Sequence, residues 1–147
     1  MFMDYTAIIL EAAKNVGVAG NLLLAICSYE SNHFKLNYNK HDPSYGICQV
    51  KKSTARMFGF KGKTKDILDP EINALYAAKY LAYQADRYHG NWVEMTGAYN
   101  SGTYNASPVV LGCPRNLDYL RRVQKELSDE DKPKLNCGYK KKKKKNK

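Results

Sequence analysis

The strongest structural signal in the sequence is the start of a long helix at Asp69. Asp69 is a residue type that caps helix N-termini, Pro70 fits the first helical position, and Glu71 complements the positive end of the helix dipole. The helix predicted from this signal runs from Pro70 to about Tyr88 and stops at Gly90. A chain of 147 residues built around such a helix fits one domain with one core.

Helix start and stop signals recur on both sides of this segment, and alternating strand patterns are scarce. A short hairpin is nevertheless expected within residues 34–50, where several side chains tolerate a strand. We therefore predict a mainly α fold. The other predicted helices span residues 5–16 after the cap Asp4 and before Gly17, 22–31 after Asn21, 54–59 after Ser53, 92–98 after Asn91, and 117–127 after Asn116.

Most of the positive charge lies at the C-terminal end. The formal net charge is +10, and seven lysines between Lys140 and Lys147 leave +3 for residues 1–139. We expect residues 129–147 to form a basic, disordered tail, because like charges repel and stay solvated. The Lys140–Lys147 tail could bind a phosphate-rich polymer, and a merely solubilising end is the simpler interpretation. The body lacks the motifs of a nucleic-acid binder.

Several other classes are not supported by the sequence. Asp4 and Glu11 interrupt the apolar N-terminal stretch, which argues against a signal peptide, and no run reaches the roughly 18 apolar residues of a membrane span. His33, His41 and His89 are scattered, so we expect no metal and no cofactor.

The four cysteines form no C-x-x-C pair, which also argues against zinc. They suit buried free thiols in a reducing compartment, or one or two disulfides in an oxidising one. Of the disulfides, Cys113 with Cys137 is the easier pairing. The sequence leaves both alternatives open.

Three separated segments carry the residues best suited to chemistry. They are Glu30-Ser31 at the end of an apolar helix, the run SYGICQV at residues 44–50, and the run AYNSG at residues 98–102. Leu24, Ile26 and Cys27 precede Glu30 on the same helix. Partial burial among such neighbours would raise the pKa of a carboxyl group, so that it could act as an acid near neutral pH.

Together and in this order, the three segments resemble the catalytic domain of the soluble lytic transglycosylases, peptidoglycan-cleaving enzymes with a lysozyme-like helical fold. The resemblance covers about residues 5–125. Ile47 and Cys48 stand where the family has Leu and Met, and Asn116-Leu117 replaces its acidic residue and Thr. Further matches are Thr54-Ala55, Leu68-Asp69-Pro70 with Asn73, Tyr80-Leu81, and Pro114 followed by Tyr119 and Val123.

The resemblance implies a lysozyme-like domain over residues 1–128 that cleaves the MurNAc-GlcNAc β-1,4 bond of peptidoglycan without water, leaving 1,6-anhydro-MurNAc ends. It implies that Glu30 is the single catalytic acid and base. The residues that it implies around the substrate are Ser31, which would also orient Glu30, Gln49 through its amide, Tyr99, Asn100, Cys48 in the sugar groove, and Tyr119, which is as well explained as a core tyrosine.

Two alternatives remain beside this interpretation. A hydrolase of the goose-type lysozyme sort would need a second acid, for which Asp42 is the candidate, although Asp42-Pro43-Ser44 is also an ordinary turn. A non-catalytic protein that binds glycan strands could retain the same fold. We expect a monomer that acts on the cell wall, carried in a phage virion or released from the host cytoplasm.

Overall fold

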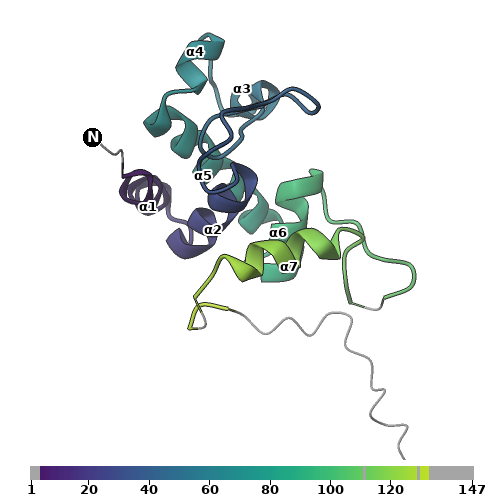
Figure 1. Ribbon diagram of the computed structural model, residues 1–147. Helices are drawn as coiled ribbons and strands as arrows, with labels where there is room; N and C mark the ends of the chain where they lie inside the picture. Colours follow the sequence, from purple (N-terminus) through teal and green to yellow (C-terminus); the bar gives the residue numbers. More distant parts are fainter. Residues whose placement is uncertain (1–3, 111, 129, 133–147) are drawn as a thin grey trace, which may run out of the picture.

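The described residues, 4–110, 112–128 and 130–132 of a computed structural model, form a helical domain with one small hairpin (Figure 1). The predicted mainly α fold and the predicted hairpin are both confirmed. In chain order the elements are α1 (Tyr5–Val16), α2 (Gly20–Glu30), β1 (Tyr38–Asn39), β2 (Ser44–Tyr45), α3 (Lys52–Met57), α4 (Thr64–Ile67), α5 (Pro70–Arg87), α6 (Trp92–Ser101) and α7 (Leu117–Lys125).

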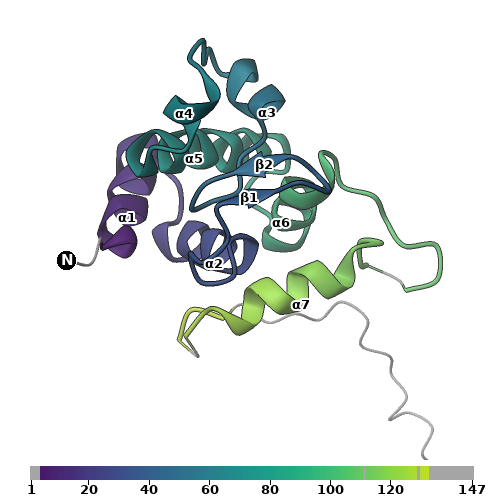
Figure 2. The same cartoon turned by 45° about the horizontal axis from the view of Figure 1, so that its top comes forward.

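Helix α5 is the centre of the packing, and Figure 2 shows it running through the middle of the domain. It contacts α1, α2, α3, α4 and α6. Asp69 caps it as predicted, accepting a hydrogen bond from the Ile72 amide at 3.0 Å. Its buried face is mostly small, which lets neighbouring helices approach closely, and consists of Asn73, Ala74, Ala77, Ala78, Leu81 and Gln84.

Two of the predicted helix starts are two residues too late. Helix α2 begins at Gly20, so Asn21 lies inside the helix, and its side chain instead donates to Asp131 Oδ2 at 2.9 Å. Helix α3 begins at Lys52, so Ser53 is not its cap. In both cases the predicted cap is a polar residue near the N-terminus of the helix. The backbone is already helical at this residue, so it lies inside the first turn.

The ends of α6 and α7 differ from prediction in a way that shapes one end of the domain. Helix α6 continues three residues beyond Ala98, to Ser101. Asn116 occupies the N-cap position of α7, but its side chain makes no capping bond. Its amide donates instead to Gly97 O at 3.0 Å and to Asn100 Oδ1 at 2.9 Å, which ties the start of α7 to α6. The short helix α4 was not predicted.

A buried asparagine on α5 holds the loop that follows the hairpin. Asn73 donates to the carbonyls of Tyr45 and Ile67, both at 2.7 Å, and accepts from the Cys48 amide at 2.8 Å. Gly46 has φ +80°, and a Cβ added there would lie 2.5 Å from Asn73 Nδ2. Only glycine therefore allows the loop to sit this close to α5.

A disulfide between Cys27 and Cys48 joins α2 to the same loop. Both residues are fully buried, and they are 21 residues apart in the chain. Of the two alternatives that the sequence left open, the structure has the disulfide for this pair. The other pairing considered, Cys113 with Cys137, involves a residue outside the described part of the chain.

The predicted basic tail, residues 129–147, lies outside the described residues except for 130–132. Among the helices of the described part, none is long and apolar enough to cross a bilayer.

Removing the disulfide is expected to destabilise the fold. Cys27→Ala should lower the free energy of unfolding by about 3 kcal/mol, because the unfolded chain regains the freedom that a closed loop of this length removes. Urea denaturation followed by circular dichroism measures this change. As a control, wild-type protein and the variant should unfold at nearly the same urea concentration when both are kept in reductant. Equal stability of the two proteins without reductant would contradict the pairing.

Candidate active site

Glu30 is the last residue of α2 and lies in a cavity of about 300 Å³. The walls come from the hairpin, α3, α5 and α6, which are brought together by the packing around α5. Polar side chains predominate in the lining, which consists of Glu30, Asn39, Asp42, Ser44, Gln49, Val50, Lys51, Ser53, Thr54, Ala77, Tyr80, Tyr99, Asn100, Ser101 and Gly102.

The Glu30 carboxyl group is poised to exchange a proton near neutral pH. Its pKa is raised from 4.5 to about 7, chiefly because burial disfavours the charged form. A hydrogen bond from Tyr119 lowers the pKa, the nearby Asp42 raises it, and Lys51 lowers it. The position at the C-terminus of a helix, where the dipole is negative, also disfavours a carboxylate.

Tyr119 holds this carboxyl group from behind. Its hydroxyl donates to Glu30 Oε2 at 2.9 Å, and its ring packs edge-on against Tyr29 with the centroids 5.6 Å apart. Burial and the nearby Glu30 raise the pKa of Tyr119 well above its ordinary value, so the phenol keeps its proton and remains a donor. Tyr119 is buried and does not line the cavity, so the structure gives it no direct access to substrate.

Tyr99 and Asn100 lie in the last turn of α6, beyond the predicted end of that helix, and both line the cavity. The Tyr99 ring contacts Tyr80 with the centroids 4.9 Å apart. Burial raises the pKa of Tyr99 well above its ordinary value, and the nearby Glu30 raises it further. Asn100 is exposed and accepts a hydrogen bond from Asn116, which orients its amide.

The amide of Gln49 is committed to the protein itself. Its Nε2 donates to Gly46 O at 2.9 Å and to Leu36 O at 3.2 Å, while Oε1 accepts from Ser44 Oγ at 3.0 Å. Both N–H groups of the side chain are therefore used. Gln49 lines the cavity, but its side chain makes hydrogen bonds that stabilise the loop. The predicted hydrogen bond from its amide to a sugar therefore does not fit this structure.

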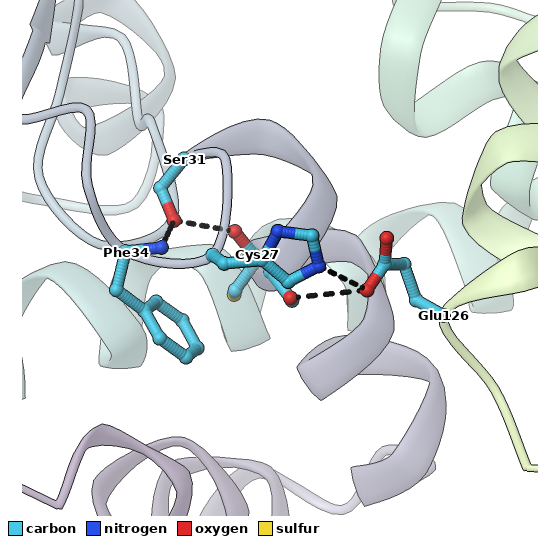
Figure 3. A network of polar contacts seen from close by, with 6 residues as sticks. Cys27, Ser31, Phe34 and Glu126 are labelled. Atoms are coloured by element: carbon cyan, nitrogen blue, oxygen red, sulfur yellow. Dashed lines mark hydrogen bonds and ion pairs between the residues drawn. The ribbon is translucent and has the colours of Figure 1, made fainter.

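Two residues predicted at the substrate lie in the core instead. Ser31 is fully buried: its hydroxyl donates to Cys27 O and accepts from the Phe34 amide, both at 2.9 Å (Figure 3). These two bonds fix the turn after Glu30 and so help to orient the Glu30 carboxyl group. Because Ser31 is fully buried, its own side chain cannot contact the substrate. Cys48 is fully buried in its disulfide and does not line the cavity, so its predicted place in the groove is wrong.

The turn after Glu30 is also fastened to the end of α7. Residues 32–34 all have positive φ, between 52° and 68°. Glu126 Oε1 accepts from Ser28 Oγ at 3.2 Å and contacts His33 Nε2 at 3.0 Å (Figure 3). Helix α7 is thus attached to the Glu30 segment at two places, through Glu126 and through Tyr119.

The cavity also contains residues to which the sequence gave no role. Tyr80 lies in a stretch matched to the family, but nothing in its spacing indicates that it reaches the cavity.

Lys51 forms an ion pair with Asp42 at 3.0 Å, with side chains 48% and 69% exposed, and such an exposed pair contributes little to stability. Asp42 lies at the turn of the hairpin, facing the same cavity as Glu30.

The described residues include no group of three or more His, Cys, Asp or Glu side chains that could hold a metal ion.

Comparison with known proteins assigns the family. The profile of the family described as "Transglycosylase SLT domain" matches residues 7–109. The chain belongs to this family. The likeness covers the segments that carry Glu30, Gln49, Tyr99 and Asn100.

Relatives of this SLT domain occur in phage and bacteria. It is 32% identical over 130 residues to the peptidoglycan transglycosylase gp16 of Escherichia phage T7, covering 86% of this chain and 9% of that protein. A solved structure of an inactive variant of the lytic transglycosylase Slt from Pseudomonas aeruginosa matches with a TM-score of 0.57 and 28% identity, over 65% of this chain and 16% of that one.

A further solved structure supports the fold alone. The 70 kDa soluble lytic transglycosylase SLT70 from Escherichia coli matches with a TM-score of 0.60 and 21% identity, over 84% of this chain and 19% of that one. The chain therefore spans a tenth to a fifth of the length of these relatives.

Burial of Glu30 is expected to cost stability at alkaline pH. With a pKa of 4.5 unfolded and about 7 folded, the folded state binds the proton more tightly, so stability falls as the pH rises from 4.5 through 7. Glu30→Gln should therefore stabilise the protein by about 2 kcal/mol at pH 8 and by much less at pH 4, as urea denaturation will measure.

The control is Glu11→Gln, which removes an exposed carboxylate of α1. It should leave the difference between the two pH values as in the wild type. A Glu30→Gln variant with the same pH dependence as the wild type would show that the carboxyl group is not desolvated.

Proposed function

We propose that this SLT domain cleaves the glycan strands of peptidoglycan as a lytic transglycosylase, with Glu30 as its catalytic residue. The observation that carries the proposal is a half-buried carboxyl group with a pKa of about 7 in a cavity lined by polar side chains. The family and the names of its relatives support the choice of substrate.

The chemistry needs one proton donor that later becomes a proton acceptor. Protonated Glu30 gives its proton to the bridging oxygen as the bond to C1 of MurNAc breaks. The N-acetyl group of the substrate stabilises the positive charge that develops at C1. The Glu30 carboxylate then takes the proton of the 6-hydroxyl while O6 bonds to C1, which closes the 1,6-anhydro ring and restores the starting acid.

The surrounding residues support these two steps. A pKa near the working pH leaves Glu30 able to give and to take a proton at comparable cost. Tyr119 fixes one carboxyl oxygen, leaving the other to meet the glycosidic oxygen. Tyr99 and Asn100, on the cavity wall, are the residues that we assign to contact with the N-acetyl group and the glycan.

A hydrolase is the second candidate, and the position of Asp42 favours keeping it. Asp42 faces the same cavity as Glu30, where a second carboxylate could hold a water molecule. Its ion pair with Lys51 and its place at the exposed hairpin turn argue for a structural and electrostatic role instead. We therefore favour the single-carboxylate mechanism.

The likeness to a phage protein supports action on a bacterial cell wall, by a protein that a phage encodes. We assign the glycan strand as the partner and propose that the domain acts as a monomer. Contact of the Lys140–Lys147 tail with a phosphate-rich polymer stays a prediction.

Mass analysis of digested peptidoglycan tests the proposal. Wild-type protein should release fragments with 1,6-anhydro-MurNAc ends, and Glu30→Gln should reduce the rate at least about a thousandfold, because an amide cannot donate the proton. Free reducing ends would identify a hydrolase. Undiminished clearing by Glu30→Gln would mean that the protein does not act through this residue.

Asp42→Asn is the matched control. It should change the rate by less than about threefold, because Asp42 acts on Glu30 only through its charge and its exposed ion pair with Lys51 contributes little. A loss of activity comparable with that of Glu30→Gln would instead make Asp42 a second catalytic acid.

A further inference from the structure

Three aromatic rings contact one another, and the first of them, Tyr80, lines the cavity. Tyr80 and Tyr83 lie on α5, and Phe58 follows α3. The centroids of Tyr80 and Tyr83 are 6.3 Å apart with an interplanar angle of only 15°, and Phe58 lies edge-on to both, at 6.5 and 5.8 Å. We call this set, Phe58, Tyr80 and Tyr83, the aromatic ledge.

The ledge begins inside the cavity and ends in solvent. Tyr80 lines the cavity and contacts Tyr99, so it belongs to the site that holds Glu30. Tyr83, one helical turn further along α5, does not line the cavity and is 38% exposed. Met57, which precedes Phe58, is 55% exposed. The ledge is therefore an outward continuation of the cavity.

Arg87 fixes the outer end of the ledge. Its guanidinium lies over the Tyr83 ring, 5.4 Å from the centroid, and donates to Gly102 O and Thr103 Oγ1, both at 2.8 Å. Gly102 is part of the cavity wall. Tyr83 is thus held in a set position relative to the cavity, although it is exposed to water, and a preformed platform loses little entropy on binding.

The chemistry of the ledge fits a sugar ring. An exposed aromatic face is unfavourable in water and gains from contact with an apolar surface. A pyranose ring presents C–H groups on one face and hydroxyl groups around its rim. It can lie on a tyrosine ring with its C–H face while the hydroxyl groups stay hydrated, and a glycan strand leaving the cavity over Tyr80 would bring its next ring to Tyr83.

We propose that the aromatic ledge binds a further sugar of the same strand, outside the cavity, and so makes the domain prefer long glycan strands over short ones. The inference rests on the proposed function, because the strand must first occupy the cavity. Tyr83 is the specificity-determining residue, because it is the exposed ring that does not line the cavity.

The test compares kcat/KM for two peptide-free peptidoglycan glycans, a tetrasaccharide and a fraction of longer strands. Tyr83→Ala should lower kcat/KM about fivefold on the longer strands and leave the tetrasaccharide within about twofold, mainly through KM. Tyr83→Phe keeps the ring and should restore the preference. Tyr76→Ala, on the same helix but outside the cavity lining, should affect both substrates alike.

Equal loss on both substrates, or no loss on the longer strands, would overturn the ledge as a binding surface. Either result would leave the proposed function standing. If wild-type protein cleaves neither glycan and also releases no fragments from whole peptidoglycan, the proposed function fails instead. In that case, calorimetric titration of wild type and Tyr83→Ala with both glycans tests sugar binding by the ledge without cleavage. An affinity for longer strands that is the same in both proteins would overturn the ledge as a binding surface.

Discussion

The partial removal of the Glu30 carboxyl group from water depends on segments that lie far apart in the chain. Helix α2 delivers Glu30 at its C-terminal end, and α7 covers it from behind with Tyr119. Burial raises the pKa of Glu30, while the Tyr119 hydroxyl keeps the charged form accessible. A single carboxyl group that must both give and take a proton needs these two opposing influences, since either alone would favour one form too strongly.

The loop that forms one wall of the cavity is held in place by buried contacts within the protein. Asn73 attaches the loop after β2 to α5, and the disulfide attaches the same loop to α2. The side-chain amide of Gln49 donates a hydrogen bond within this loop. Ser31 sets the turn that follows Glu30. Residues that resemble sugar ligands in the sequence are thus supports that fix the position of Glu30, and a supported site loses little free energy to reorganisation during the reaction.

The fold was largely predictable because its helix signals are local. Asp4, Asp69 and Asn91 each cap the helix that their position predicts, and helical spacing extends the rest. The partial burial of Glu30 was predictable because its helix is apolar, whereas its catalytic role was implied by the resemblance to the family. The pairing of Cys27 with Cys48, the inward turn of Ser31 and the internal bonds of Gln49 depend on tertiary contacts between distant residues. Motif spacing does not reveal which way a polar side chain points.

The titration of Glu30 is the most direct test of its role as proton donor and acceptor. Carbon-detected NMR of protein with labelled glutamate side chains follows each carboxyl group with pH, and the Glu30→Gln variant assigns the Glu30 signal. The midpoint for this residue should be about 7. A midpoint near 4.5, the ordinary value, would show a carboxylate already ionised at neutral pH and would contradict its role as the proton donor.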